Sequence, residues 1–223
     1  MVLSIPIQNQ IPREEFDYQT LVDVLKGYSR PRNKIADLIR KGVIVRVKKG
    51  LYIFGNDYRR RPFSKELLAN LIFGPSYISL DFALQYHGLI PERVEAVTSV
   101  TIGRSKRFST PLGLFVYRSI PLPAYQTGMM RVERSKDVSF LIATAEKALC
   151  DKIFDNRGVQ LRSFKDLQYY LHDNLRIQRS GLAAMNPAAI GLFADRYRSG
   201  KMRLLKRWLE RVKGDKGKEL DDE

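Results

Sequence analysis

The chain has 223 residues, of which 44% are hydrophobic and 28% charged, a balance typical of a globular protein with one or two domains. Lysine and arginine outnumber aspartate and glutamate by 39 to 24, and the resulting charge of +15 favours a polyanionic partner, either nucleic acid or an anionic membrane surface. The single cysteine, Cys150, excludes a disulfide framework and a cysteine-based zinc site, and two histidines leave little material for a metal site or a catalytic triad.

No segment has the pattern of a membrane anchor or a secretion signal. The longest apolar run, residues 67–73, is far shorter than the roughly 18 residues that a transmembrane helix needs. The N-terminus lacks a basic stretch followed by an apolar one, and Pro6 and Pro12 interrupt it. We therefore expect a cytoplasmic protein without a membrane partner, a metal site or a cofactor.

The positive charge is concentrated near the two ends of the chain. Residues 26–61 hold 12 basic side chains against two acidic ones, and residues 196–213 hold eight against Glu210 alone. The last ten residues, 214–223, are rich in glycine, lysine and aspartate, and they predict a disordered tail.

The first predicted elements are two helices. Asp17 is a good N-cap for a helix of about ten residues that ends before Gly27. Ser29, Arg30 and Pro31 are typical of a second helix start, with a capping hydroxyl and a proline in the first turn. This second helix, about residues 31–41, places apolar side chains on one face and basic or polar ones on the other.

A β-hairpin is predicted directly after the second helix. Residues 43–47 and 51–54 are β-branched and apolar, and the turn between them, residues 48–50, is Lys-Lys-Gly. Helix, turn, polar helix and basic-tipped hairpin is the layout of a winged helix–turn–helix, whose second helix reads the DNA major groove. The predicted DNA-binding residues are Arg30, Arg32, Asn33, Lys34, Arg40, Lys41, Arg46, Lys48, Lys49, Arg59, Arg60 and Arg61.

Each of these residues also has a structural interpretation. A charged helix face can simply be solvated, and Arg46 can be an exposed ladder residue of its strand. Asp37 can pair along the helix with Lys34, Arg40 or Lys41. Tyr52 is interpreted as packing within the hairpin.

Residues 64–213 predict a larger second domain, after a DNA-binding domain at residues 1–63. Helices are expected at about 64–73, 80–86, 144–154 and 164–172, with one or two more from Pro187. Between them, alternating or β-branched segments predict an antiparallel sheet of four or five strands. The fold class expected for the chain is therefore α+β: an N-terminal winged helix–turn–helix, then a larger mixed domain with an antiparallel sheet and C-terminal helices.

The last predicted helix is amphipathic. Leu205, Trp208, Leu209 and Val212 form an apolar stripe suited to docking. The opposite face is either a solvated surface or a second phosphate-contacting patch, and its basic residues are Arg203, Lys206, Arg207 and Arg211.

Three segments resemble a known family. Residues 38–52 contain the second helix and the hairpin, residues 77–92 include His-Gly-Leu-Ile-Pro-Glu at 87–92, and residues 142–151 include Ala-Glu-Lys-Ala-Leu at 145–149. In this order they resemble the AbiEi-like antitoxins of type IV toxin–antitoxin systems, over roughly residues 17–155. The extended start, residues 1–16, departs from typical members, and whether residues 13–16 complete the helix–turn–helix stays open.

The resemblance implies a DNA-binding autorepressor and antitoxin. Members of this family bind inverted repeats upstream of their own operon with the N-terminal domain. Their C-terminal domain counteracts a cognate nucleotidyltransferase toxin in abortive phage infection. For this chain, the resemblance implies double-stranded operator DNA and such a toxin as partners.

The sequence contains no motif with adequate catalytic chemistry, so we predict no catalytic residues and no enzyme. A Walker-type phosphate loop, a Gly-x-Ser-x-Gly elbow and a His-Glu-x-x-His motif are all missing. Two alternatives remain. A magnesium-dependent nuclease would use carboxylates such as Glu95, Glu133, Asp151 and Asp155, and an RNA-binding module would use exposed aromatic residues such as Phe115, Tyr117 and Tyr125.

Overall fold

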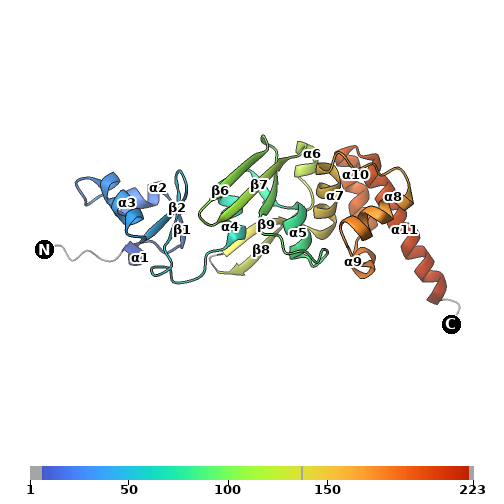
Figure 1. Cartoon of the computed structure of the whole chain (residues 1–223), viewed down its shortest axis with the longest axis horizontal. Helices are drawn as coiled ribbons and strands as arrows, with labels where there is room; N and C mark the ends of the chain where they lie inside the picture. The colour runs from blue at the N-terminus through green and yellow to red at the C-terminus, as the bar shows by residue number, and fades with distance from the viewer. Residues whose placement is uncertain (1–6, 137, 221–223) are drawn as a thin grey trace.

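Three bodies of secondary structure follow one another along the long axis of the molecule in the computed structural model, which describes residues 7–136 and 138–220 (Figure 1). A small N-terminal unit, residues 7–61, lies at one end. A six-stranded sheet occupies the middle, and a group of helices forms the other end. We call residues 64–220, which hold the sheet and the helices, the C-terminal unit.

The N-terminal unit combines helices with a three-stranded antiparallel sheet in the order β1-β3-β2. The predicted hairpin, β2 and β3, is present, and residues 15–17 add a third strand beside it. The elements are α1 (Ile7–Gln10), β1 (Glu15–Asp17), α2 (Tyr18–Val24), α3 (Pro31–Arg40), β2 (Ile44–Lys48) and β3 (Leu51–Phe54).

Helices α2 and α3 begin where the sequence predicts, but only one of them has the predicted capping side chain. Asp17 caps α2 by accepting a hydrogen bond from the backbone N–H of Thr20, and Pro31 is the first residue of α3. Ser29 is not the cap of α3. Arg30 is the N-cap residue and makes no side-chain capping bond, because the turn between the helices places Ser29 one position too early.

Both faces of the small sheet are apolar. Along β3, Tyr52 and Phe54 belong to the core cluster under α2 and α3, whereas Leu51 and Ile53 belong to the large core of the C-terminal unit. Side chains of a strand alternate between its two faces, so β3 is buried throughout. Val47 of β2 joins the same large core, and the two units therefore share one hydrophobic cluster.

The sheet of the C-terminal unit is mixed, and the prediction of an antiparallel sheet was wrong. Its strand order is β6-β7-β5-β4-β9-β8, in which β4 lies parallel to β9 and β5 parallel to β7. The strands are β4 (Ser76–Ile78), β5 (Val97–Thr101), β6 (Lys106–Thr110), β7 (Gly113–Ser119), β8 (Met129–Ser135) and β9 (Val138–Ala143).

The predicted and the observed sheet differ because the alternation of apolar and polar residues along a strand contains no information about which strands lie side by side. The short loop at Gly103 suggests a hairpin between β5 and β6, but β7 lies between these two strands. β6 and β7 form the actual hairpin, and β5 pairs with β7 in parallel. Strand β4, with only three residues, has too short a pattern to be predicted.

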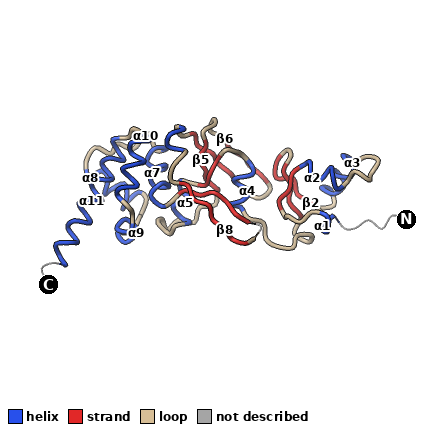
Figure 2. The backbone as a smooth tube through the Cα atoms, turned by 180° about the vertical axis from the view of Figure 1, so that it is seen from behind, coloured by secondary structure: helices blue, strands red, loops and turns tan. Residues whose placement is uncertain are grey.

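Helix α4 covers the sheet face toward the N-terminal unit, while α5 and α7 cover the opposite face and lead into the helical end (Figure 2). The predicted helix starts at Ser64 and Thr144 are confirmed, and each of these side chains caps its helix by accepting a hydrogen bond from a first-turn backbone N–H. The helices are α4 (Lys65–Ile72), α5 (Leu80–Tyr86), α6 (Leu122–Tyr125), α7 (Ala145–Asp155), α8 (Phe164–Tyr169) with the π-helical turn η1 (Tyr170–Asn174), α9 (Arg179–Ala184), α10 (Pro187–Tyr197) and α11 (Gly200–Leu220).

The C-terminal end also differs from the expected tail. Helix α11 continues through Leu220, whereas the sequence predicts disorder from residue 214, and residues 221–223 lie outside the described part of the chain. The predicted apolar stripe of this helix is buried at Leu205, Trp208 and Leu209. Within the described residues, no helix combines the length and apolar character needed to cross a bilayer.

Candidate nucleic-acid interface

Helix α3 presents a basic face to solvent at the outer end of the molecule (Figure 1). Ile35 and Leu38 are buried in the core of the N-terminal unit and hold the helix in place. The opposite face is exposed, as the sequence predicts. It is formed by Arg32, Asn33, Arg40 and Lys41, with Arg30 exposed at the start of the helix.

The single acid of this helix is paired. The Asp37 carboxylate accepts a hydrogen bond from Arg40 at 2.6 Å and forms an ion pair with Lys41 at 3.0 Å. Hydrogen bonds from these two side chains hold the pKa of Asp37 below its ordinary value. Lys34 lies with its ammonium 5.1 Å from the centre of the Tyr28 ring and is half-buried. The charge at the C-terminal end of the helix is thus partly neutralised, and Arg32 and Asn33 remain in the first turn, directly after Arg30.

A hollow of about 530 Å³ lies beside the first turn of α3. Besides residues 30–33 it is lined by Tyr18, Gln19 and Val22 from α2. Tyr18 and Gln19 are exposed and were missed by the sequence interpretation. The predicted N-cap Asp17 could have indicated them, because an N-cap at residue 17 places Tyr18 and Gln19 in the first turn of the helix.

The hairpin supplies fewer free cations than expected. Arg46 and Lys49 are exposed, the first on β2 and the second in the turn. The Lys48 ammonium instead donates a hydrogen bond to the backbone carbonyl of Ile72, at the end of α4. Burial, together with the nearby charge of Lys106, lowers the pKa of Lys48. Lys48 thus belongs to the contact between the two units.

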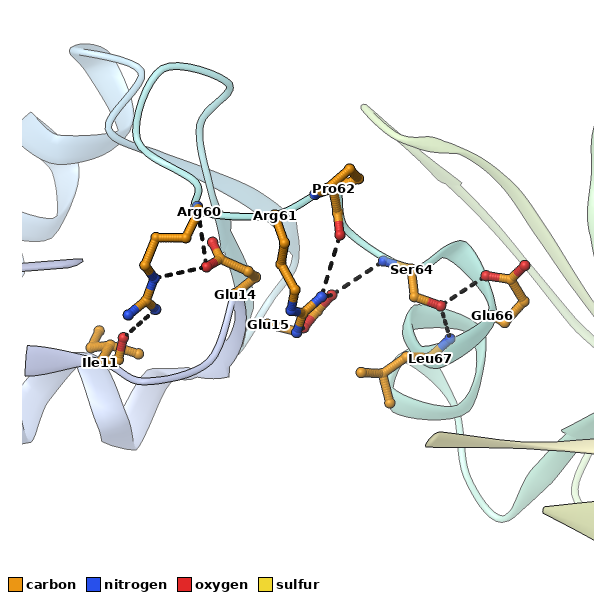
Figure 3. A network of polar contacts seen from close by, with 9 residues as sticks. All are labelled: Ile11, Glu14, Glu15, Arg60, Arg61, Pro62, Ser64, Glu66 and Leu67. Atoms are coloured by element: carbon orange, nitrogen blue, oxygen red, sulfur yellow. Dashed lines mark hydrogen bonds and ion pairs between the residues drawn. The ribbon is translucent and has the colours of Figure 1, made fainter. Parts of the chain in front are cut away.

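Arg60 and Arg61 lie at the junction of the two units (Figure 3), and Arg59 directly precedes them in the chain. Arg60 binds the buried Glu14 carboxylate at 3.0 Å and the Ile11 carbonyl at 2.7 Å. The other two arginines are also engaged: Arg61 binds the buried Glu15 at 2.8 Å, and Arg59 lies 5.2 Å from the Phe63 ring centre.

Glu15 joins the two units directly. Its carboxylate accepts hydrogen bonds from Arg61 and from the backbone N–H of Ser64, the N-cap of α4 (Figure 3). A buried carboxylate needs such donors, since an unpaired one would be strongly destabilising. We call Glu14, Glu15, Arg60 and Arg61 the junction clamp. The adjacent acids and arginines were visible in the sequence, but their pairing depends on β1 lying beside β3.

The second predicted basic patch lies on α11, at the opposite end of the molecule from α3 (Figure 1). Arg207 is exposed there. Arg203 lies 3.8 Å from Asp195, and Lys206 lies 3.6 Å from Glu210. Arg211, on the same helix, is exposed as well. The patch is therefore separate from the surface of α3.

The carboxylates considered for a nuclease are engaged elsewhere. Asp151 is fully buried and accepts hydrogen bonds from Lys147, Tyr197 and Ser79, the last two at 2.5 and 2.6 Å. Asp155, one helical turn further on, pairs with Arg118 at 3.4 Å.

The aromatic residues considered for RNA stacking also lie in the interior. Phe115 and Tyr117 are buried in the core, and Tyr125 is half-buried. In the part of the chain that the structure describes, no group of three or more histidine, cysteine, aspartate or glutamate side chains could hold a metal ion. Comparison of the chain with protein-family models and with curated proteins finds no match.

Proposed function

We propose that the N-terminal unit is a winged helix–turn–helix that binds duplex DNA with α3 in the major groove. The exposed basic face of α3, together with Arg30 at its start, is the observation that carries the proposal. Arginine and asparagine form bidentate hydrogen bonds with guanine and adenine edges, which makes Arg32 and Asn33 the candidates for base reading.

The arrangement of the unit supports the proposal. Two helices joined by a short turn, then a hairpin paired with an earlier strand, is the layout expected of a winged helix. Lys49 at the exposed turn and Arg30 before α3 are placed to contact phosphates. Lys48 and residues 59–61 are assigned to the junction instead of the DNA surface.

The resemblance to AbiEi-like antitoxins extends this proposal to a biological role. The chain would repress its own operon by binding inverted repeats and would counteract a nucleotidyltransferase toxin in the cytoplasm. The proposal assigns no catalytic step to the chain. Since the surface of α3 already accounts for DNA binding, we place toxin neutralisation in the C-terminal unit.

Gel-shift and footprinting assays on the DNA upstream of the operon test the first part. Replacing Arg32 and Asn33 with alanine should cost about 1–3 kcal/mol per lost bidentate contact and relax sequence preference. Arg179→Ala, at an exposed arginine at the start of α9, is the matched control and should leave the footprint unchanged. An unaltered footprint in the Arg32/Asn33 double variant would refute the assignment of α3.

Co-expression with the toxin tests the second part. The full chain carrying Arg32→Ala and Asn33→Ala should still restore growth, although an operon reporter is no longer repressed. The full chain is the right vehicle because Val47, Leu51 and Ile53 pack into the core of the C-terminal unit. If growth and repression were lost together, neutralisation would depend on DNA binding, and the division of roles would be wrong.

A further inference from the structure

A cleft of about 540 Å³ lies between the two units beside β1. One wall consists of residues 11–13 and 15–17 with Thr20 and Leu51, and the other consists of side chains from α4 and from β8 and β9. Cavities of about 300–1,000 Å³ between domains are the usual size and position of small-molecule sites. Figure 3 shows Leu67 on the side of α4 that faces Ile11 and Glu15.

The cleft contains apolar surface from both walls. Ile11 and Phe16 contribute from the N-terminal unit, and Leu67 and Leu71 contribute from α4. The two leucines are four residues apart and therefore share one face of the helix. Leu71 is 44% exposed, although the next residue, Ile72, is fully buried. The outward face of α4 thus keeps an apolar side chain in solvent at the wall of a cavity.

Three basic side chains line the same cleft. Arg13 lies on the N-terminal wall, and Arg131 and Lys136 lie on the wall formed by the hairpin. Arg131 is 3.2 Å from Glu133, but both side chains are mostly exposed, and ion pairs in water contribute little.

The two acids of the cleft already have donors from the protein. Glu15 is bound by Arg61 and by the Ser64 backbone N–H. Asp17 accepts hydrogen bonds from the backbone N–H and the hydroxyl of Thr20, at 2.8 and 2.7 Å. Among the described residues that line the cleft, the three cations outnumber the two carboxylates, one of which is already paired with Arg61, so this described lining is net positive.

We propose that this cleft binds an amphipathic organic anion, a small molecule with an apolar body and one carboxylate or sulfonate group. The apolar body packs on Leu67 and Leu71, and the acid group lies among Arg13, Arg131 and Lys136. The proposal is independent of DNA binding by α3, because it uses none of the same residues.

Fluorescence titration of the full chain with 8-anilinonaphthalene-1-sulfonate tests this site. The dye should saturate at one molecule per chain. Octanoate should displace it at a concentration about tenfold lower than octanol, which has the same apolar length and no charge. An apolar groove without selective cations would bind both competitors equally, and that result would overturn the proposal.

Variants locate the site. Leu71→Gln should weaken the dye about tenfold, because it removes exposed apolar surface. Arg131→Gln with Lys136→Gln should abolish the preference for octanoate over octanol. Leu192→Gln and Arg207→Gln, at exposed positions on α10 and α11, are the matched controls and should bind as the unaltered chain does. Equal binding by cleft and control variants would show adventitious surface binding and would also refute the site.

Discussion

Lys147 and Asp151 form an ion pair that is completely inaccessible to solvent. Tyr197 and Ser79 complete the hydrogen bonding of the carboxylate from α10 and from the start of α5. Taking two charges out of water is costly, and only a full set of partners offsets that cost. The two charged residues lie on α7 and join it to the start of α5 and to α10.

Asp151→Asn should therefore destabilise the protein strongly. The change leaves the Lys147 ammonium buried without a counter-charge, for which we expect a loss of about 3–5 kcal/mol in the free energy of unfolding. Urea denaturation measures it. A double variant, Lys147→Met with Asp151→Leu, should recover much of the loss because both charges are removed. If the single variant unfolded within about 1 kcal/mol of the unaltered chain, the pair would not be buried as described.

The same network makes stability sensitive to alkaline pH. Burial and the nearby Asp151 charge raise the pKa of Tyr197 far above its ordinary value of 10, and they raise the pKa of Tyr77 in the same way. Both states keep these phenols protonated below pH 10, whereas above it only the unfolded chain releases their protons. Stability should therefore fall as pH rises beyond 10. Urea titrations between about pH 8 and 11 should show a shallower decline for Tyr197→Phe.

Among the individual elements, the turn that leads into β8 has little space. Gly128 has a φ of +78°, and a Cβ atom there would lie 2.6 Å from the Phe193 ring and 2.8 Å from Lys147 Cγ. Gly50, in the β2–β3 turn, has a φ of +87° and no atom within 4 Å of such a Cβ. Both glycines need a positive φ, which other residues rarely adopt, but only Gly128 is closely surrounded by other atoms.

Gly128→Ala should cost about 1–3 kcal/mol more than Gly50→Ala. The excess measures the displacement of Phe193 and Lys147, since strain from the positive φ is common to both variants. Thermal or urea unfolding of the two variants provides the comparison. Equal losses would mean that α10 moves aside freely, which the buried position of Phe193 opposes.

The elements that the sequence predicts well are those with local signals. Helix caps and the basic face of α3 can be recognised from residues that are close together in the sequence. Examples are the caps Asp17, Ser64 and Thr144. Strand order in the large sheet, the pairing of Arg60 and Arg61 with β1, and the contact of Lys48 with α4 depend on residues far apart in sequence. Periodicity contains no information about such contacts, and four of the twelve predicted DNA-binding residues, Lys48 and residues 59–61, lie at the junction of the units instead.

The whole molecule depends on the junction between its two units. Shared packing at Val47, Leu51 and Ile53 crosses it, and so does the hydrogen bond from the Ser64 backbone N–H to Glu15 of the junction clamp. Separating residues 64–213, the predicted second domain, from the N-terminal unit would therefore expose this shared apolar surface to solvent.

Separated fragments 1–63 and 64–223 should each unfold at a lower temperature than the same unit does in the intact chain. The physical reason is the loss of burial at the shared cluster, at about 25 cal/mol per Å² of apolar area. Calorimetry of the fragments and of the full chain measures the difference. Full-length Glu15→Gln, which weakens the junction clamp and leaves the shared packing intact, is the control. Its unfolding midpoint should lie between those of the fragments and that of the unaltered full chain. Unchanged midpoints in both fragments would contradict a shared core.

Because both faces of the small sheet are apolar, even-numbered and odd-numbered apolar residues of its hairpin pack into different cores. On β2 and β3 the even positions Ile44, Tyr52 and Phe54 support α3, and the odd positions Val47 and Ile53 contact the C-terminal unit. For the apolar positions of this hairpin, the parity of the residue number therefore indicates which of the two cores a substitution disturbs. Lys48 is the exception among the polar positions, because it contacts Ile72 of the C-terminal unit from an even position after a register shift in β2. Changes at Tyr52 and Phe54 disturb the packing beneath α3, and changes at Val47 and Ile53 disturb the packing of the N-terminal unit against the rest of the protein.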